Sequence, residues 1–307
     1  MRICLLTRSN RGNDINNFFY VKALKNASLK RGHTFDIIDP GDLIYYIQED
    51  NLLIKTGSNK NILDFDVYIP KVVLIKEGVK RISDRGILVK YLIDHNKIFF
   101  NFTESFRSSS RSKMYDFFRL ASNNVPLIPS IYIEDNKDLE SVDKYIKKFN
   151  FSYPLILKSN KGLQGKNLFY TTTRKEVHNV LQKYRDISFI IQPYYEIMHD
   201  LRIIVLKGKI LGTMDKIHKK DDFRGNIAQG AIGVPYDLDK AVQNIALNAA
   251  QVDGSEFVGV DIAITNKGPF VLEVNRNLGF QGFSKFLKVD TAGIIVEYLE
   301  SLYNHAL

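Results

Sequence analysis

Over the first hundred residues, short apolar runs alternate with segments whose apolar residues recur at helical spacing. The clearest of these segments extends from Phe18 to Leu29, and Gly32 then acts as a helix stop. A second helix is expected around Ile82–Ile93. Strands are expected at Arg2–Leu6, Phe35–Ile38, Val67–Ile69 and Ile98–Phe100. This alternation of strand and helix indicates a small parallel α/β domain.

The pattern changes after a helix that is expected over Glu104–Ala121. From Pro154 onward short strands follow one another, which is typical of an α+β arrangement with antiparallel pairs. The helices expected in this part are Arg174–Tyr184, Leu238–Val252 and Thr291–Tyr303. The strands expected in this part are Leu155–Lys158, Leu168–Tyr170, Phe189–Gln192, Leu201–Leu206, Lys209–Asp215, Phe257–Thr265 and Pro269–Asn275.

Length and cysteine content narrow the class of protein only a little. The chain has 307 residues, which is enough for two or three packed subdomains. Its single cysteine, Cys4, cannot form an internal disulfide, which favours a reducing compartment. No apolar stretch approaches the length of a membrane span. We therefore expect a cytoplasmic protein that does not enter a membrane.

The formal net charge is +9, from 43 basic and 34 acidic residues. A basic balance suits binding of nucleic acid, nucleotides or acidic peptides, and it also arises from a solvated surface rich in lysine. The basic residues are scattered along the chain, and no nucleic-acid-binding module is recognisable. Charge alone leaves these alternatives open, and binding of nucleic acid is the least supported of them.

Two carboxylates give the strongest local signal. The last two expected strands form a hairpin, and pairing Thr265 with Pro269 places Asp261 opposite Glu273. Opposed carboxylates repel each other unless a cation neutralises them. Asn275 projects on the same face as Glu273 and adds a third oxygen ligand. Such a set suits Mg²⁺ that also contacts phosphate, and the alternative is a solvent-facing strand pair with two coincidental acids.

A second candidate is the loop after the strand that ends in Lys158. Gly162 and Gly165 let its backbone approach a ligand closely, and backbone amides beside lysines can cradle phosphate. The spacing is not that of a Walker loop. A hairpin loop without a ligand is the alternative interpretation of the two glycines.

A third set combines two arginines with polar neighbours. Asp200 and Arg202 alternate on one strand face, and Arg224 and Asn226 begin a segment punctuated by glycine. Arginine beside phosphate stabilises the charge that develops in phosphoryl transfer, although a single arginine more often makes a surface ion pair. Other chemistries have less support, because Cys4 lies within a strand and the six histidines lack metal-binding spacing.

In their order and spacing, these residues resemble the ATP-grasp superfamily. They are most similar to its RimK-type glutamate ligases, which modify a ribosomal protein, and to related peptide ligases. The resemblance extends over nearly the whole chain. The segments that carry it are Arg31-Gly32-His33, Ile38-Asp39-Pro40, Phe65–Pro70, Arg111-Ser112-Lys113, Lys158 with its glycine loop, Gln192-Pro193-Tyr194, Asp200-Leu201-Arg202, Asp222–Asn226, Val260-Asp261-Ile262 and Leu272–Asn275.

The resemblance implies an α/β plus α+β fold of the ATP-grasp type with an N-terminal Rossmann-like domain. The implied parts are the N-terminal domain at 1–100, an ATP-grasp N-subdomain at 101–186 and a C-subdomain at 187–307. It also implies an ATP-dependent carboxylate–amine ligase that uses Mg²⁺, or Mn²⁺ in its place. In such an enzyme a carboxylate is activated as an acyl phosphate, which an amine then attacks.

The resemblance also implies a role for each matching residue. The nucleotide phosphates would contact Lys113 and Lys158, and the ribose would contact Asp200. The backbone at adenine would be that of Gln192, Pro193 and Tyr194. The catalytic residues would be Arg224 and Asn226, which would face the γ-phosphate and the acyl phosphate, together with Arg202. The metal ligands would be Asp261, Glu273 and Asn275.

Three positions depart from the family pattern. Pro193 stands where relatives have Glu, Ser112 stands where they have Asp, and the stretch from Arg276 to Phe283 differs from their usual Ser-Pro-Gly segment. We therefore expect the ATP chemistry to be kept, while transfer of glutamate to a ribosomal protein does not follow. A silent nucleotide-binding module is the main alternative, but the complete ligand set argues against it.

The substrate is expected to be an amino acid or peptide that bears a carboxylate. Arg8 and Arg11 follow the first strand, and Arg276 follows the metal ligand Asn275. All three are candidates for binding that carboxylate, and the alternative is that these arginines only solvate loops. The sequence does not determine the oligomeric state, so a homo-oligomer is left open.

Overall fold

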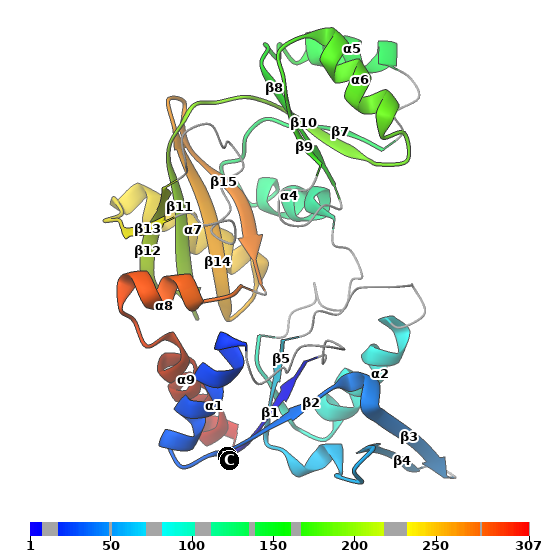
Figure 1. Ribbon diagram of the computed structural model, residues 1–307, viewed down its shortest axis with the longest axis vertical. Coiled ribbons are helices and arrows are strands. Elements are labelled where there is room, and N and C mark those ends of the chain that lie inside the picture. The colour runs from blue at the N-terminus through cyan, green and yellow to red at the C-terminus, as the bar shows by residue number, and fades with distance from the viewer. Residues whose placement is uncertain are drawn as a thin grey trace. The chain divides into compact units, whose positions relative to one another are not determined.

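The computed structural model describes residues 1–7, 18–48, 51–71, 82–101, 112–134, 139–160, 167–217, 232–276 and 278–306. The chain forms two compact units, one made of Met1–Ser109 with Gly279–Leu307 and the other of Ser110–Leu278. The last part of the chain therefore does not stay with the expected C-subdomain at 187–307. From Gly279 onward it belongs to the first unit, because helix α9 (Thr291–Ala306) packs beside α1 (Phe19–Lys30) (Figure 1).

The first unit contains the parallel α/β arrangement that the sequence predicts. Its four-stranded sheet has the order β2-β1-β5-β6, and each adjacent pair is parallel. The strands are β1 (Arg2–Leu6), β2 (Thr34–Ile38), β5 (Val67–Pro70) and β6 (Ile98–Phe99). Cys4, Leu6 and Tyr68 belong to a buried cluster that also includes Leu88 and Leu92 of α2 (Ile82–Asp94).

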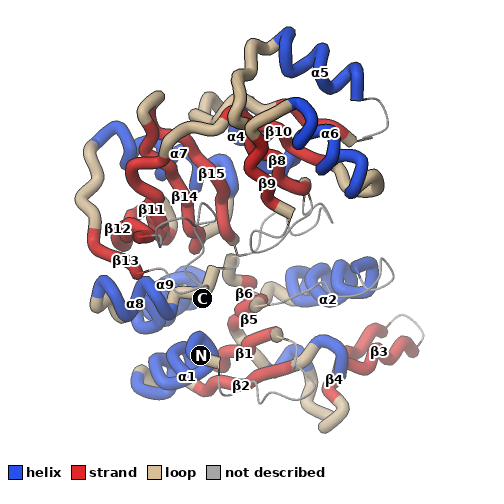
Figure 2. The backbone as a smooth tube through the Cα atoms, turned by 45° about the horizontal axis from the view of Figure 1, so that its top comes forward, coloured by secondary structure: helices blue, strands red, loops and turns tan. Residues whose placement is uncertain are grey.

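Two further features of this unit were not predicted. A hairpin of β3 (Leu43–Gln48) and β4 (Asn51–Thr56) projects from its side (Figures 1 and 2), and no glycine marks its turn. The other is an ion-pair cluster, in which Glu300 of α9 accepts from Arg31 Nε at 2.9 Å and lies 2.6 Å from His33 Nε2. The hydrogen bond from Arg31 is the main reason that the pKa of Glu300 falls to about 2.

The second unit contains two antiparallel sheets, each with helices on it (Figure 2). The smaller sheet has the order β7-β10-β8-β9. Its strands are β7 (Ile131–Ile133), β8 (Leu155–Ser159), β9 (Leu168–Thr171) and β10 (Phe189–Pro193). Helices α5 (Leu139–Lys148) and α6 (Arg174–Lys183) share one buried apolar cluster with this sheet.

The larger sheet carries most of the candidate residues. Its order is β13-β12-β11-β14-β15. The strands are β11 (Ile197–Leu206), β12 (Lys209–Ile217), β13 (Ile232–Pro235), β14 (Phe257–Thr265) and β15 (Gly268–Asn275). Ala246, Ala249 and Ala250 of α7 (Lys240–Asp253) pack against its buried face, and Leu120 of α4 (Lys113–Ala121) joins the same cluster.

Helices α4 and α8 (Gln281–Leu287) complete the described elements. The sequence predicts a helix from Glu104, whereas the described part of α4 starts at Lys113, and residues 102–111 lie outside the described residues. Among the described helices, none combines the length and the apolar composition that crossing a membrane requires.

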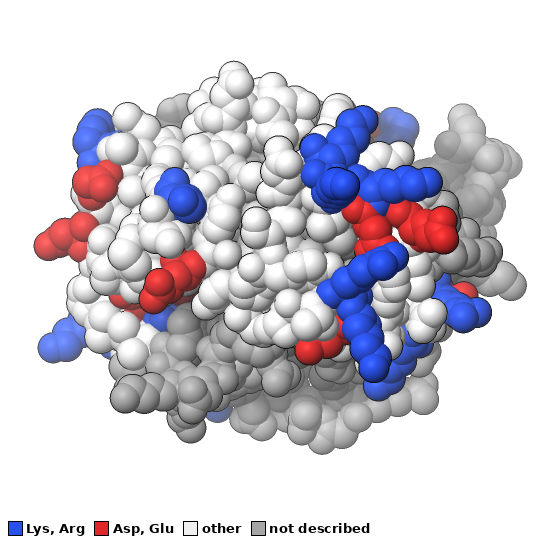
Figure 3. Space-filling model, turned by 90° about the horizontal axis from the view of Figure 1, so that it is seen from above, with Lys and Arg blue, Asp and Glu red and all other residues white. Residues whose placement is uncertain are grey.

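Charged side chains of both signs lie next to each other on the face drawn in Figure 3. In the second unit, Asp143 of α5 joins Arg174 of α6, whose Nη2 lies 2.5 Å from Asp143 Oδ2, and His178 at 3.0 Å. Among the described residues on this face, basic side chains therefore lie beside acidic ones.

Candidate active site

Asp261 and Glu273 lie directly opposite each other on β14 and β15, which confirms the pairing predicted from the sequence. The predicted loop is nevertheless wrong by one residue, because Thr265 pairs with Gly268 rather than with Pro269. Gly268 has a φ of +116°, a backbone conformation that side chains disfavour. The strand pair then contains a bulge between Asp261 and Ile262 that shifts the register and brings Glu273 opposite Asp261.

Asp261 is buried and is held by two cations. Arg202 on β11 donates from Nε and Nη2 to the two carboxylate oxygens at 2.8 and 2.6 Å. Lys216 Nζ lies 3.7 Å from Asp261 Oδ2. Burial alone would raise the pKa of Asp261, but Lys216 and Arg202 outweigh that effect and hold the pKa below its ordinary value. Asp261 is therefore a stable carboxylate at neutral pH.

Lys216 on β12 is a site residue that the sequence analysis missed. Its side chain is only 4% exposed, and its Nζ lies 2.6 Å from Asp200 Oδ1. It therefore connects Asp200, the expected ribose ligand, to Asp261, the expected metal ligand. One signal in the sequence could have indicated that Lys216 is buried. Strand alternation puts it on the same face as the apolar Met214, which is buried.

Glu273 differs from Asp261 because its side chain keeps contact with solvent. Its pKa is nevertheless raised, first by desolvation from the surrounding protein and then by repulsion from Asp261. A bound cation would relieve this repulsion. Asn275 Nδ2 donates to Asp261 Oδ2 at 3.2 Å, so the amide lies next to the Asp261 carboxylate.

The donor set fits a hard cation such as Mg²⁺, since the two carboxylates and the amide offer oxygen ligands. The described residues contain no group of three or more His, Cys, Asp or Glu side chains that could hold a metal ion. The candidate metal site therefore consists of two carboxylates and the amide of Asn275, whose ligand set water or phosphate oxygens would complete.

Two lysines from different elements lie near these carboxylates. Lys158 is the penultimate residue of β8, and its Nζ lies 4.4 Å from the centre of the Phe117 ring. Desolvation, followed by repulsion from Lys113, lowers the pKa of Lys158 to about 7, although Glu273 opposes the change. Desolvation also lowers the pKa of Lys113 against the attraction of Glu273. Two neighbouring ammonium groups with depressed pKa values form a site that an anion such as phosphate would stabilise.

Asn160 sets the place of Lys113 and was not identified from the sequence. Its Oδ1 accepts hydrogen bonds from Ser112 Oγ and from Met114 N, both at 3.0 Å. Its carbonyl accepts from Lys113 N at 3.2 Å, and Ser112 caps α4. The end of β8 is thereby fixed to the start of α4, so that Lys113 and Lys158 lie close enough to interact.

Comparison with known proteins identifies the family. Residues 111–299 match the model of the RimK-like ATP-grasp domain. The chain belongs to the RimK-like ATP-grasp family. It is therefore an ATP-dependent carboxylate–amine ligase with the ATP-grasp fold.

Relatives match this RimK-like ligase along nearly its whole length. A "Probable alpha-L-glutamate ligase" of Enterobacter sp. (strain 638) is 25% identical over 306 residues, which cover 98% of this chain and 96% of the relative. The ribosomal protein bS6–L-glutamate ligase of Salmonella paratyphi B is 24% identical, with the same coverage.

Solved structures show the same fold. The ATP-grasp ligase PsnB, complexed with a minimal precursor, has a TM-score of 0.75 at 16% identity, covering 97% of this chain and 98% of its own. D-Alanine–D-alanine ligase from Bacillus anthracis, complexed with ATP, has a TM-score of 0.69 at 15% identity, covering 99% of this chain and 98% of its own.

The three residues expected at adenine lie at the end of β10 in this RimK-like fold. Gln192 is buried and donates from Nε2 to Ser130 Oγ at 2.7 Å, so its side chain supports the sheet. The N–H of Tyr194 donates to the Pro154 carbonyl at 2.9 Å. Contacts of Gln192, Pro193 and Tyr194 with adenine remain a prediction.

Several expected residues lie outside the described residues. They are Arg8, Arg11, Gly162, Gly165, Arg224 and Asn226. Arg202, expected to be catalytic, is described, and its guanidinium holds Asp261. Arg276 was expected to bind a substrate carboxylate, and this expectation has to be corrected. Its guanidinium is bound to two carboxylates of the protein, those of Asp116 and Asp253.

Proposed function

We propose that this RimK-like ligase transfers the γ-phosphoryl group of ATP to a substrate carboxylate and then joins the acyl group to an amine. In the first step ADP leaves and an acyl phosphate forms. In the second step the amine attacks the acyl carbon, inorganic phosphate leaves and an amide remains. The proposal rests chiefly on one observation, which is that Asp261 lies directly opposite Glu273 at the place where Asn160 joins the lysine-bearing ends of β8 and α4.

The described residues have separate tasks in this proposal. Lys113 and Lys158 hold the phosphates, and Asp200 holds the ribose. Asp261, Glu273 and Asn275 hold Mg²⁺, with Mn²⁺ as a substitute, and the metal would neutralise charge on the transferred phosphate. Positioning and charge neutralisation supply most of the rate enhancement in such chemistry. Arg224 and Asn226 are proposed to contact the transferred phosphoryl group.

We infer that the substrate is an amino acid or peptide. The named relatives include a ligase that acts on ribosomal protein bS6, and PsnB is complexed with a precursor. Both point to a peptide or protein chain as one partner of the reaction. The buried free thiol of Cys4 is consistent with work in the reducing cytoplasm.

The test is a screen for ADP release with Mg²⁺, ATP and sets of amino acids and acidic peptides. Hydroxylamine is added to parallel reactions, because it converts an acyl phosphate into a stable hydroxamate. We expect ADP release only with a suitable carboxylate, together with a hydroxamate of that substrate. Binding of ATP without turnover across the whole screen would instead favour the silent nucleotide-binding module.

A further inference from the structure

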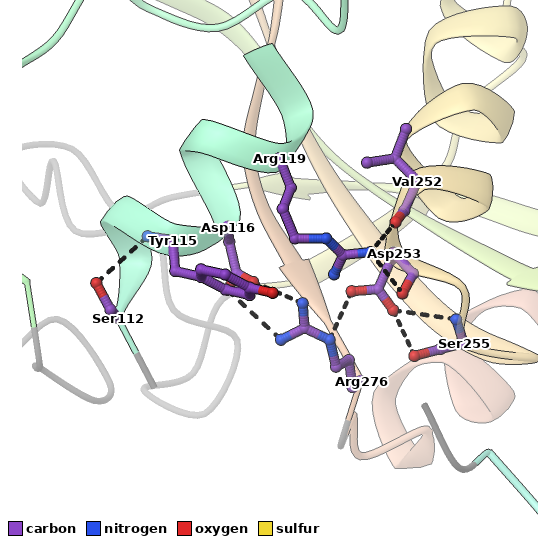
Figure 4. Close-up of polar contacts among 8 residues, drawn as sticks. All are labelled: Ser112, Tyr115, Asp116, Arg119, Val252, Asp253, Ser255 and Arg276. Atoms are coloured by element: carbon purple, nitrogen blue, oxygen red, sulfur yellow. Dashed lines mark hydrogen bonds and ion pairs between the residues drawn. The ribbon is translucent and has the colours of Figure 1, made fainter. Parts of the chain in front are cut away.

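Arg276 lies directly after β15, and its guanidinium is divided between two carboxylates that come from two different helices (Figure 4). Its Nη2 donates to Asp116 Oδ1 of α4 at 2.6 Å, and its Nη1 lies 3.5 Å from Asp116 Oδ2. Its Nε lies 2.5 Å from Asp253 Oδ2 at the end of α7. One side chain therefore connects the end of the metal-binding strand with both helices.

The Asp253 side of this cluster is rigid. Asp253 is buried, and its Oδ1 accepts hydrogen bonds from the Ser255 hydroxyl and from Ser255 N, the latter at 3.2 Å. Desolvation would lower the pKa of Arg276, but Asp253 and then Asp116 outweigh it and raise the pKa. Because leaving a buried carboxylate without its cation is strongly unfavourable, Arg276 stays in place.

Asp116, the other partner of Arg276, lies on the same helix as the candidate phosphate ligand Lys113. Asp116 lies three residues after Lys113 on α4, so both side chains project from the same side of the helix. Arg276 lies one residue after Asn275 and three after Glu273. The pair Arg276–Asp116 is therefore a direct link between the strand that carries the candidate metal ligands and the helix that carries a candidate phosphate ligand.

We propose that Arg276 is a positioning residue, which fixes α4 so that the Lys113 ammonium is held at a set place relative to Glu273 and Asn275. This inference rests on the proposed function, because it assigns Lys113 to the phosphates of ATP. The position of a phosphate-binding lysine matters, since charge-assisted hydrogen bonds weaken steeply when their geometry is lost. Arg276 acts on the nucleotide through α4 and does not touch it.

Arg119 provides a matched control on the same helix. Its Nη2 donates to the carbonyl of Val252 and lies 3.4 Å from that of Asp253. It therefore joins α4 to the end of α7 through backbone carbonyls, whereas Arg276 joins α4 to the end of β15 through Asp116. Replacing Arg119 removes a link of α4 and leaves the pair Arg276–Asp116 in place.

The experiment compares Asp116→Asn, Arg276→Gln, Arg276→Lys and Arg119→Gln. The affinity for Mg²⁺ and a non-hydrolysable ATP analogue is measured by calorimetry on the folded protein, and Tm is measured in parallel. We expect Asp116→Asn and Arg276→Gln to weaken nucleotide binding about tenfold, and Arg119→Gln by less than twofold even where it lowers Tm equally. Arg276→Lys keeps one ion pair and should recover part of the loss.

A double variant separates positioning from general destabilisation. Asp116→Asn combined with Arg276→Gln should bind the analogue no more weakly than Arg276→Gln alone, because both changes break the same link. If Arg276→Gln does not fold, Asp116→Asn still tests the idea, since it leaves the pair Arg276–Asp253 intact.

The inference is overturned if Asp116→Asn binds the analogue within twofold of the wild type, or if Arg119→Gln weakens binding as much. Failure of the proposed function gives a different result. In that case the wild-type protein itself does not bind the analogue with Mg²⁺, or binds it without any carboxylate-dependent release of ADP from ATP.

Discussion

Lys158→Met should make the nucleotide-free protein more stable while it weakens ATP binding. The wild-type lysine carries its charge in partly buried surroundings beside Lys113, which lowers its pKa from 10.5 to about 7. At about 1.4 kcal/mol per pKa unit, this corresponds to about 5 kcal/mol of unfavourable free energy at neutral pH. Because the Lys158 side chain keeps some contact with water, we expect about half of this free energy, roughly 2–3 kcal/mol, to appear as added stability of Lys158→Met.

The sign of the effect follows from linkage. Below pH 7 the lysine is charged in both the folded and the unfolded state, so the wild type carries the full cost there. Between pH 7 and 10.5 the unfolded state binds the proton more tightly, so the stability that this group contributes rises with pH. The stability gap between Lys158→Met and the wild type should therefore be widest at pH 7 and below, and should close toward pH 10.5.

The assay is urea unfolding of the nucleotide-free protein at a series of pH values, with ATP affinity measured at pH 7. Lys183→Met is the matched control, because Lys183 is an exposed lysine whose Nζ also lies near a ring, 5.5 Å from the centre of Tyr184. The control should change neither stability by more than about 0.5 kcal/mol nor ATP affinity. A loss of stability in Lys158→Met, or a gap that does not depend on pH, would refute this account of the phosphate site.

Three further predictions concern the two carboxylates, Lys216 and the protonation of Lys158. Glu273→Gln should abolish Mg²⁺-dependent turnover without loss of stability. Asp261→Asn should abolish turnover and also lower the free energy of unfolding in urea by about 3 kcal/mol, because Arg202 and Lys216 lose the carboxylate that they share. Equal stabilities of the two variants would contradict this. Lys216→Met should destabilise the protein by about 3 kcal/mol, since it leaves Asp200 and Asp261 without their shared cation. Thermal unfolding measures this loss, and a midpoint equal to that of the wild type would contradict the prediction. ATP binding at pH 8 should take up close to one proton, because phosphate raises the depressed pKa of Lys158, and calorimetry in buffers of different ionisation enthalpy would show no buffer dependence if this is wrong.

Local patterns predicted which carboxylates face each other better than they predicted the loop that joins their strands. Strand alternation and a short loop were enough to oppose Asp261 and Glu273, but the true pairing of Thr265 with Gly268 depends on a bulge that alternation cannot reveal. The role of Lys216 could not be predicted, because its partners come from other strands of the sheet. Lys216 resembles its neighbours in a lysine-rich stretch until the sheet sets it beside Asp200.

The error at Arg276 has the same origin. A loop arginine next to a metal ligand suggests a substrate contact, but Asp116 is 160 residues away in the sequence and becomes its partner only in the folded unit. The sequence pattern also could not predict the unit to which α9 belongs. Its apolar stripe predicts that it packs against something, and only the folded chain shows that this is α1.

The return of α9 to α1 bears on how the molecule forms during synthesis. The unit that begins at Met1 also needs Gly279–Leu307, whereas Ser110–Leu278 is continuous along the chain. Along the chain, α1 is synthesised before the whole of Ser110–Leu278, whereas the helix that packs beside it is synthesised after that unit. Until α9 is made, α1 lacks its neighbouring helix, and Arg31 and His33 lack Glu300. The unit that contains α1 is therefore completed only when α9 has been made.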